Sequence, residues 1–224
     1  MFCTPSLTGP TKPYIKALEQ SIPLIVGAGW EEGYAQEIGN AYISNARAVL
    51  AHRAIKGGAD VFVFLDYDLS WEPKHLLKLI ETPGDVVGGT YRYKQETEEY
   101  MGIIRSGEDH RPICRDDGCI HAAWLPAGFL KLTRAAFETY RAAYPEFLFG
   151  DETTNEQSLD LFNHGAKHGT WWGEDAAFCR NWNEIGGQVW CVPDLNITHW
   201  SGETPYKGNF HEFLLRQPGG SKAA

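Results

Sequence analysis

Two aspartates, Asp66 and Asp68, close a run of large apolar residues at positions 61–65. The run is short and rich in β-branched and aromatic residues, which is typical of a central strand covered on both faces. Open α/β sheets bind their ligands beyond the ends of such strands. Carboxylates two positions apart at this place can hold one hard divalent cation between them and a bound diphosphate. The pattern also fits an acidic turn before a helix that Glu72 and Pro73 begin, since carboxylates favour helix N-termini.

Two further acidic residues, Glu174 and Asp175, open a predicted helix after Gly173. Acidic side chains in a first helical turn stabilise the helix dipole by roughly 0.3–1 kcal/mol. A carboxylate in this position can also act as a general base that removes a proton from an attacking hydroxyl. The two roles are compatible, so both interpretations stay open.

A histidine, two tryptophans and two basic residues complete the set of candidates. His199 lies between a strand and Ser201-Gly202, and an imidazole beside two carboxylates suits Mn²⁺ or Mg²⁺. Trp171 and Trp172 either form a wall for a sugar ring or pack in the ordinary way. Arg92 and Lys94 either reach a phosphate or lie on a solvated face.

The composition predicts one α/β domain. The chain has 224 residues, of which 43% are hydrophobic and 22% charged, as in ordinary soluble globular proteins. We expect a domain over residues 1–218 and a disordered tail over residues 219–224. No apolar stretch approaches the roughly 18 residues that a membrane span needs. An odd number of cysteines, five, with no segment typical of a secretory signal predicts reduced thiols and a cytoplasmic protein.

The net charge of −9 restricts the partners of the protein. A protein that binds nucleic acid electrostatically needs a basic surface, so the charge argues against nucleic acid as a partner. The same charge would repel a phosphate-rich ligand unless a metal ion offset the repulsion. The charge is therefore consistent with a cation at Asp66 and Asp68.

Alternating strand and helix patterns surround these aspartates. Strands are predicted over residues 1–6, 22–26, 61–65 and 85–90, and helices over residues 14–20, 44–56 and 74–80. Ser44 is expected to cap the second helix, and residues 27–39 are expected to form a loop. The alternation predicts an α/β fold with a mostly parallel central sheet flanked by helices.

The second half of the chain is less regular. Residues 100–105 and 120–125 predict two strands paired across a polar turn, which would add a small antiparallel region. A helix is expected over residues 132–143, a surface excursion over residues 146–173 and a last strand over residues 189–192.

Several pieces of the chain recur in one order in the small GT-A glycosyltransferases, a family that the chain resembles from about Phe2 to Gly208. The matching pieces are Thr4-Pro5-Ser6, Asn45-Ala46-Arg47, Phe64-Leu65-Asp66-Tyr67-Asp68, Val87-Gly88-Gly89-Thr90-Tyr91, Pro126-Ala127-Gly128-Phe129, Gly173-Glu174-Asp175-Ala176-Ala177-Phe178-Cys179-Arg180, Thr198-His199-Trp200-Ser201-Gly202 and Tyr206-Lys207-Gly208. The resemblance implies a single GT-A (Rossmann-like) domain and a metal-dependent nucleotide-sugar transferase.

The resemblance also implies roles for individual residues. Asp66, Tyr67 and Asp68 match the metal and nucleotide motif of the family, and His199 matches a histidine that often completes the metal shell. Arg47 lies where a polar contact to the nucleotide is common.

Other matches concern the two ends of the donor. Thr4, Pro5 and Ser6 match the loop that meets the base and ribose. Gly128 matches a position whose missing side chain leaves room for the donor sugar, and Lys207 matches a C-terminal loop that covers the diphosphate.

Glu174 and Asp175 match the pair from which inverting members of the family draw their base. The spacing from Asp175 to Arg180 is tighter than in the commonest bacterial inverting pattern, which makes the base less secure than the metal ligands.

Together these features predict a glycosyltransferase that uses Mn²⁺ or Mg²⁺ to move a sugar from a nucleoside diphosphate, with UDP favoured, to an acceptor hydroxyl. Inversion is the favoured stereochemistry. Three alternatives stay open: a retaining transferase on the same scaffold, a sugar-1-phosphate nucleotidyltransferase and a non-catalytic sugar-binding module. The nucleotidyltransferase would be expected to carry a glycine-rich basic loop after the first strand, and residues 4–12 contain one glycine.

Overall fold

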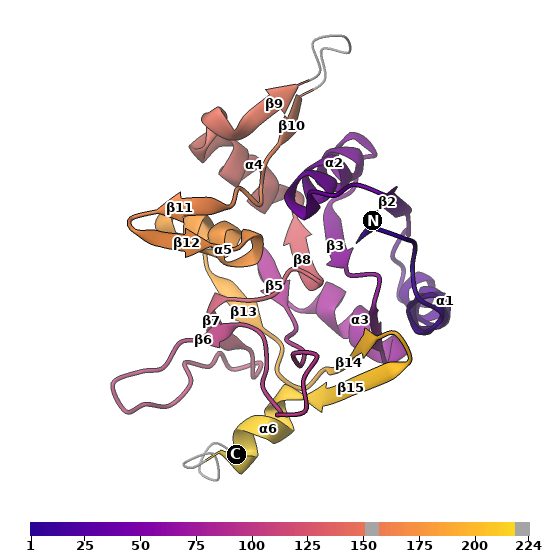
Figure 1. Ribbon diagram of the computed structural model, residues 1–224, viewed down its shortest axis with the longest axis vertical. Coiled ribbons are helices and arrows are strands. Elements are labelled where there is room, and N and C mark those ends of the chain that lie inside the picture. Colours follow the sequence, from indigo (N-terminus) through magenta and orange to yellow (C-terminus); the bar gives the residue numbers. More distant parts are fainter. Residues whose placement is uncertain (151–156, 218–224) are drawn as a thin grey trace.

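The computed structural model describes residues 1–150 and 157–217, and the tail predicted over residues 219–224 lies outside them. An eight-stranded sheet forms the centre of the fold (Figure 1). In spatial order its strands are β2 (Tyr34–Ile38), β1 (Phe2–Ser6), β3 (Val61–Leu65), β8 (Phe129–Thr133), β5 (Val86–Gly88), β13 (Val189–Cys191), β7 (Ile120–Trp124) and β6 (Ile103–Ile104). Strands β1, β2, β3, β5 and β13 share one direction, whereas β8 lies antiparallel between β3 and β5, and β7 is antiparallel to β13. The α/β class is confirmed, and the sheet is mixed.

Helices cover both faces of this sheet because its strands bury side chains on both sides. The helices are α1 (Lys12–Gly27), α2 (Ile43–Lys56), α3 (Pro73–Glu81), α4 (Arg134–Ala143), α5 (Glu174–Glu184) and α6 (Phe210–Arg216). In β3, Phe62 and Phe64 pack against the side that α2, α4 and α5 cover, and Val63 and Leu65 pack against the side that α1 and α3 cover. This alternation confirms the predicted central strand at 61–65.

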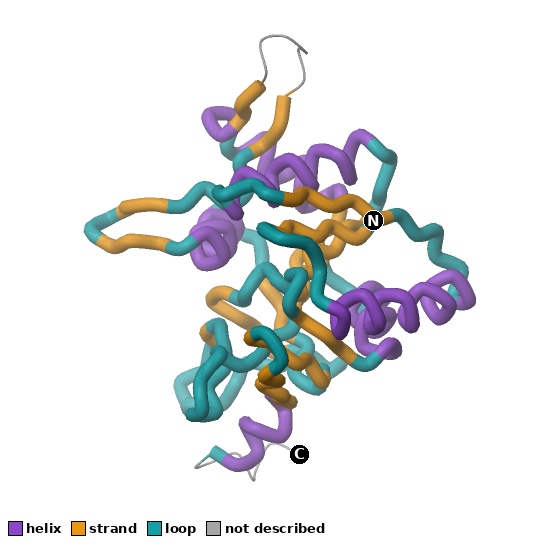
Figure 2. The backbone as a smooth tube through the Cα atoms, turned by 45° about the vertical axis from the view of Figure 1, so that its right-hand side comes forward, coloured by secondary structure: helices purple, strands orange, loops and turns teal. Residues whose placement is uncertain are grey.

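At one edge of the central sheet, strands β6 and β7 pair antiparallel, as predicted for the segments at 100–105 and 120–125. Smaller antiparallel units lie outside this sheet. A three-stranded sheet combines β4 (Leu69–Trp71), β14 (Asn196–Ser201) and β15 (Thr204–Asn209). A short 3₁₀ helix, η1 (Pro145–Phe147), precedes two hairpins, β9 (Leu148–Gly150) with β10 (Gln157–Leu159) and β11 (Gly165–Lys167) with β12 (Thr170–Trp172). The hairpins extend away from the central sheet (Figures 1 and 2).

The strand predicted over residues 22–26 is wrong, because this segment forms the last turns of α1. Its side chains do not alternate in burial: Ile25 is buried, as are Leu18 and Ser21 at helical spacing, while Leu24 and Val26 are exposed. A run of five apolar residues does not by itself distinguish a strand from a helix turn.

The second strand of the sheet is instead β2, which lies inside the predicted loop over residues 27–39. Its residues, a mixture of polar and apolar types, are half-buried or exposed because β2 is an edge strand that pairs only with β1. Ser44 is not the cap of α2, since the helix begins one residue earlier, after Tyr42, with no side-chain cap.

The later strands also differ from the prediction. Residues 129–133 form β8, so the predicted helix over 132–143 begins two residues later, where the Thr133 side chain accepts a hydrogen bond from the Ala136 amide. Strand β13 is not the last strand, because the β14–β15 hairpin follows it. Among the described residues, no helix is long and apolar enough to cross a membrane.

Candidate functional site

A cleft of about 320 Å³ lies beyond the carboxyl ends of β1 and β3. It brings together most of the residues that the sequence singles out. These are Pro5, Ser6, Arg47, Asp66, Tyr67, Asp68, Glu174, Asp175 and His199. They come from β1, α2, the β3–β4 connection, the start of α5 and β14, which are far apart in the sequence.

Backbone hydrogen bonds fix the β3–β4 connection from three sides. The amide of Asp66 donates to the carbonyl of Gly128 (2.9 Å), and the carbonyl of Tyr67 accepts from the amide of Thr11 (3.0 Å). The carbonyl of Asp68 accepts from the amide of Trp200 (2.8 Å). The last bond ties Asp68 to β14, beside His199.

The guanidinium of Arg47 is the centre of the cleft. Its side chain is only 2% exposed and bonds to three carboxylates. Nη2 donates to Asp66 Oδ1 (2.9 Å), and Nη1 donates to Glu174 Oε1 (2.9 Å) and Asp175 Oδ1 (3.2 Å). The ring of Phe162 lies 5.3 Å from the guanidinium carbon. Arg47 therefore joins α2, the end of β3 and the start of α5 through its two terminal nitrogens, while Nε is buried without a hydrogen-bond partner.

Three carboxylates around one guanidinium leave an excess of negative charge in a buried place. Burial, together with the nearby charges of Glu174 and Asp66, raises the pKa of Asp175 to about 7 against the opposing effect of Arg47. For Glu174, burial also acts to raise the pKa, but the charge of Arg47 and the hydrogen bonds to the carboxylate together outweigh it, and the pKa is lowered. Asp175 is therefore the carboxyl group of this cluster poised to exchange a proton near neutral pH.

Asp68 and His199 form a second pair at the cleft. His199 Nε2 lies 3.7 Å from Asp68 Oδ2, and His199 Nδ1 lies 2.9 Å from the carbonyl oxygen of Arg92. Because a carbonyl only accepts, Nδ1 carries the hydrogen, and in the neutral ring the lone pair of Nε2 faces Asp68. Burial acts to raise the pKa of Asp68, but the interactions with protonated His199 and with Lys94 together outweigh it and lower the pKa, so the carboxylate stays charged.

This pair fits a divalent cation. Bonds from Mg²⁺ or a similar ion to oxygen or nitrogen are about 2.1 Å long, so two atoms that bind one ion lie up to about 4.2 Å apart. Asp68 Oδ2 and His199 Nε2 satisfy this limit, and the carbonyl behind His199 sets the tautomer that a ligand needs. Within residues 1–150 and 157–217, no three His, Cys, Asp or Glu side chains are grouped so as to hold a metal. Phosphate oxygens and water would complete the shell, as is usual for Mg²⁺.

Asp66, the third predicted ligand, points elsewhere. Its Oδ1 accepts from Arg47, and its Oδ2 lies 3.4 Å from the hydroxyl of Tyr91. Burial raises the pKa of Tyr91 well above its ordinary value, so the hydroxyl is a donor. Tyr91 was not among the predicted site residues. The feature of the sequence that could have identified Tyr91 as a site residue is its position just after β5, in the segment Gly88-Gly89-Thr90-Tyr91.

Two other residues predicted to bind the donor, Thr4 and Gly128, are packed against other groups of the protein. The side chain of Thr4 is fully buried and hydrogen-bonds the hydroxyl of Tyr14. A Cβ at Gly128 would overlap the Tyr91 hydroxyl and the Asp66 carboxylate, so the protein itself fills the space predicted for a sugar. The glycine instead permits these two groups to approach the backbone.

Lys207 lies on the far side of the β14–β15 hairpin. It pairs with Thr198, whereas His199 pairs with Tyr206, and adjacent pairs face opposite sides of a sheet. Lys207 lines another pocket, of about 570 Å³, together with Thr198.

The two tryptophans lie on β12, directly before α5. Trp171 is 72% exposed. Trp172 is half-buried, its Nε1 donates to the carbonyl of Lys167 (3.3 Å), and the guanidinium of Arg180 lies 4.8 Å from its ring centre. Trp172 therefore packs, while Trp171, which meets the ring of His164 (6.2 Å between ring centres), is largely exposed three residues before the start of α5.

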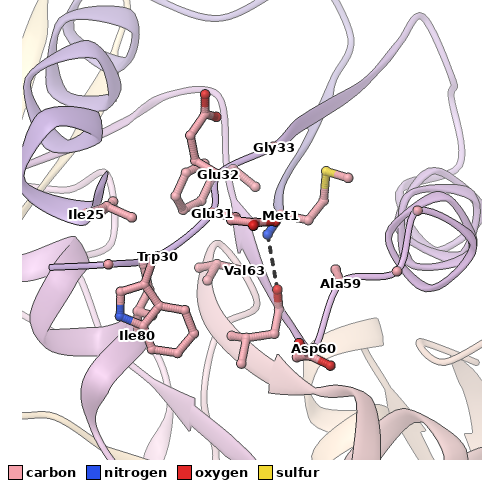
Figure 3. A pocket seen from close by; sticks show the side chains of 15 residues that line it. Met1, Ile25, Trp30, Glu31, Glu32, Gly33, Ala59, Asp60, Val63 and Ile80 are labelled. Carbon is pink, nitrogen blue, oxygen red and sulfur yellow. Dashed lines mark hydrogen bonds between the residues drawn. The ribbon is translucent and has the colours of Figure 1, made fainter. Parts of the chain in front are cut away.

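A further pocket, of about 460 Å³, lies at the amino ends of β1 and β3, away from this cleft (Figure 3). It is lined by apolar side chains and glycines, with Glu31, Glu32 and Asp60 at its edge. None of its lining residues, all of them described, is Lys, Arg or His. It therefore lacks a cationic side chain for a phosphate and is a weaker candidate than the cleft at the carboxyl ends.

No family model matches the chain, and no curated protein matches it. Among solved structures, the chain is similar to the crystal structure of A197 from STIV, with 17% sequence identity and a TM-score of 0.53. The match covers 90% of this chain and 85% of that one. At this identity the likeness shows a shared fold and carries no conclusion about activity.

The position of Arg47 predicts a large effect on stability. Arg47→Met leaves three carboxylates without their partner, so we expect the free energy of unfolding to fall by about 3–5 kcal/mol at neutral pH. Urea denaturation measures it. Arg53→Met is the matched control on the same helix, because Arg53 is 48% exposed and pairs with Glu37; its loss should cost less than about 1 kcal/mol. Equal costs would contradict the central role of Arg47.

Asp175 predicts a pH dependence of stability. Its pKa of about 7 in the folded protein exceeds the ordinary value of 3.8, so this group contributes stability at low pH that is lost as the pH rises through 7. Asp175→Asn removes the loss, and we expect it to stabilise the protein more at about pH 8 than at about pH 5. Urea denaturation at both values tests this, with the exposed Asp116→Asn as control. If the unfolding free energies of Asp175→Asn and the wild type differ by the same amount at both pH values, the raised pKa of Asp175 is contradicted.

Proposed function

We propose that the protein is a metal-dependent glycosyltransferase that moves a sugar from a nucleoside diphosphate, with UDP favoured, to an acceptor hydroxyl. One observation carries the proposal: Asp68 and His199, whose Oδ2 and Nε2 atoms lie 3.7 Å apart, line the same cleft as Asp175, a carboxyl group with a pKa of about 7. A cation site and a group that can accept a proton are the two components that such a transfer needs.

The donor would occupy the cleft with its diphosphate at Asp68 and His199. A divalent cation held there supplies positive charge where the leaving diphosphate becomes more negative. Pro5 and Ser6, which line the cleft at the end of β1, would lie beside the nucleoside. The sugar would then extend toward Asp175 and the start of α5.

Asp175 is proposed as the general base. The acceptor hydroxyl loses its proton as it attacks the sugar carbon, and a carboxylate with a pKa near the working pH both accepts that proton and is available in its charged form. Arg47 and Glu174 are proposed as positioning residues, because Arg47 bonds to both carboxylates. Trp171, exposed at the approach to α5, is proposed to contact a carbohydrate acceptor through its ring.

A retaining transferase is the second candidate. It is favoured by the contact of one guanidinium nitrogen, Arg47 Nη1, with both Glu174 and Asp175, since such a pair could serve only to position substrates. The configuration of the product at the anomeric carbon, measured by NMR, separates the two: inversion supports the base role, and retention excludes it.

The cation pair predicts two graded losses of binding. Asp68→Ala should abolish Mn²⁺-dependent binding of UDP in a folded protein, because it removes the charged ligand. His199→Ala should weaken binding less, since the imidazole brings no negative charge. Calorimetric titration of UDP with Mn²⁺ present measures both. Unchanged affinity in a folded Asp68→Ala protein would remove the metal site from the proposal.

The base role predicts a separation of turnover from binding. Asp175→Asn keeps the shape of the side chain, so UDP should bind nearly as in the wild type while turnover falls by about 10²-fold or more. Glu174→Gln should have the smaller effect. Steady-state kinetics of both variants decides the assignment. Near-normal turnover in Asp175→Asn would exclude it as the base, and a larger loss in Glu174→Gln would transfer the role to Glu174.

A further inference from the structure

We propose that Lys94 competes with the divalent cation for Asp68 and, once displaced, binds the diphosphate of the donor. The inference rests on the proposed function, because that function supplies the divalent cation and the donor diphosphate. It assigns to Lys94 a binding role at the leaving group and explains why cation and donor would bind together.

The first step of the argument is the contact itself. Lys94 Nζ lies 2.5 Å from Asp68 Oδ2, the same oxygen that faces His199 Nε2 at 3.7 Å. A cation bound between Asp68 and His199 would therefore share this oxygen with the ammonium group. Two positive charges on one carboxylate oxygen repel each other strongly at this distance. Lys94 must leave Asp68 before the cation can bind with full strength.

The second step is that Lys94 can release Asp68, which lines the cleft, and still remain beside it. Its side chain is 35% exposed, and Asp68 is its hydrogen-bond partner among the described residues. The backbone on both sides is anchored: the guanidinium of Arg92 donates to the carbonyls of Gln95 (3.2 Å) and Glu96 (2.9 Å), and the carbonyl of Arg92 bonds to His199. The released ammonium therefore stays within reach of the cation site, on a flexible four-carbon chain.

The third step is the destination of the ammonium group. A donor whose diphosphate binds the cation brings negative oxygens to the place that Lys94 has left, and an ammonium group forms short charge-assisted hydrogen bonds with phosphate. Arg47, the buried cation that lines the cleft, is already bonded to three carboxylates. Lys94, partly exposed beside Asp68, has a charge to offer the diphosphate. It exchanges one anionic partner for another.

The proposal predicts effects of opposite sign in one variant. In Lys94→Met, Mn²⁺ alone should bind at least about threefold more tightly, because the ammonium group that competes for Asp68 is gone. A change of this size is expected when a partly exposed ion pair is lost. UDP in the presence of saturating Mn²⁺ should bind about threefold more weakly or worse, because the phosphate loses a partner. Paramagnetic resonance of free Mn²⁺ measures the first affinity, and calorimetry measures the second.

Lys78→Met is the matched control. Lys78 also forms a 2.5 Å ion pair with an aspartate, but its partner Asp194 does not line the cleft, whereas Asp68 does. This variant makes the same change in net charge. Both affinities should stay at the wild-type value in the control. The melting temperature of each variant confirms that it is folded.

Unchanged Mn²⁺ affinity in Lys94→Met, or unchanged UDP affinity, would overturn the proposal, because it requires both effects. A wild-type protein that binds neither Mn²⁺ nor UDP would instead overturn the proposed function. The two failures are therefore distinguishable in the same set of titrations.

Discussion

The arrangement of the cleft depends on one buried charge, the guanidinium of Arg47. A charged group with 2% exposure is tolerated only when its hydrogen bonds are made to opposite charges, and here Asp66, Glu174 and Asp175 supply them. These partners come from β3 and α5, whereas Arg47 comes from the second turn of α2. Satisfying one guanidinium therefore forces three elements to meet where β3 ends, and the cleft forms at that meeting point.

The electrostatics of the cleft follow from an unequal count of charges. Arg47 cannot neutralise three carboxylates, so the excess is relieved by a raised pKa at Asp175. On the other side of the cleft, Asp68 is neutralised by Lys94, with His199 beside it. Each half thus has a carboxylate whose charge is balanced by another group: a proton at Asp175 and the ammonium group of Lys94 at Asp68. A protein with a net charge of −9 needs such local compensation to accept a diphosphate.

The parts of this structure that the sequence predicts well are those where a local pattern and the tertiary environment agree. The run 61–65 is apolar at every position because both faces of β3 are covered, and the helix at 174 begins with acidic residues that suit its N-terminus. Residues 22–26 fail as a strand because an apolar run at the end of a helix has the same composition. Strand β2 is missed because an edge strand is held by backbone bonds to β1, and its sequence has no continuous or alternating apolar pattern.

In the site, too, local patterns locate the residues, whereas their contacts depend on the tertiary structure. Asp66 and Asp68 follow a recognisable strand, yet their different partners depend on groups distant in sequence: Arg47 and Tyr91 for Asp66, and Lys94 and His199 for Asp68. The side on which Lys207 lies depends on the register of the β14–β15 hairpin, which local composition does not define.

The most direct test of the central claim is a screen of nucleotide sugars for slow transfer to water, with and without Mn²⁺. The account predicts that the protein releases nucleotide from at least one donor, with a UDP-sugar favoured, and that the release requires Mn²⁺. Release at the same rate without the metal, or no release from any nucleotide sugar, would contradict it.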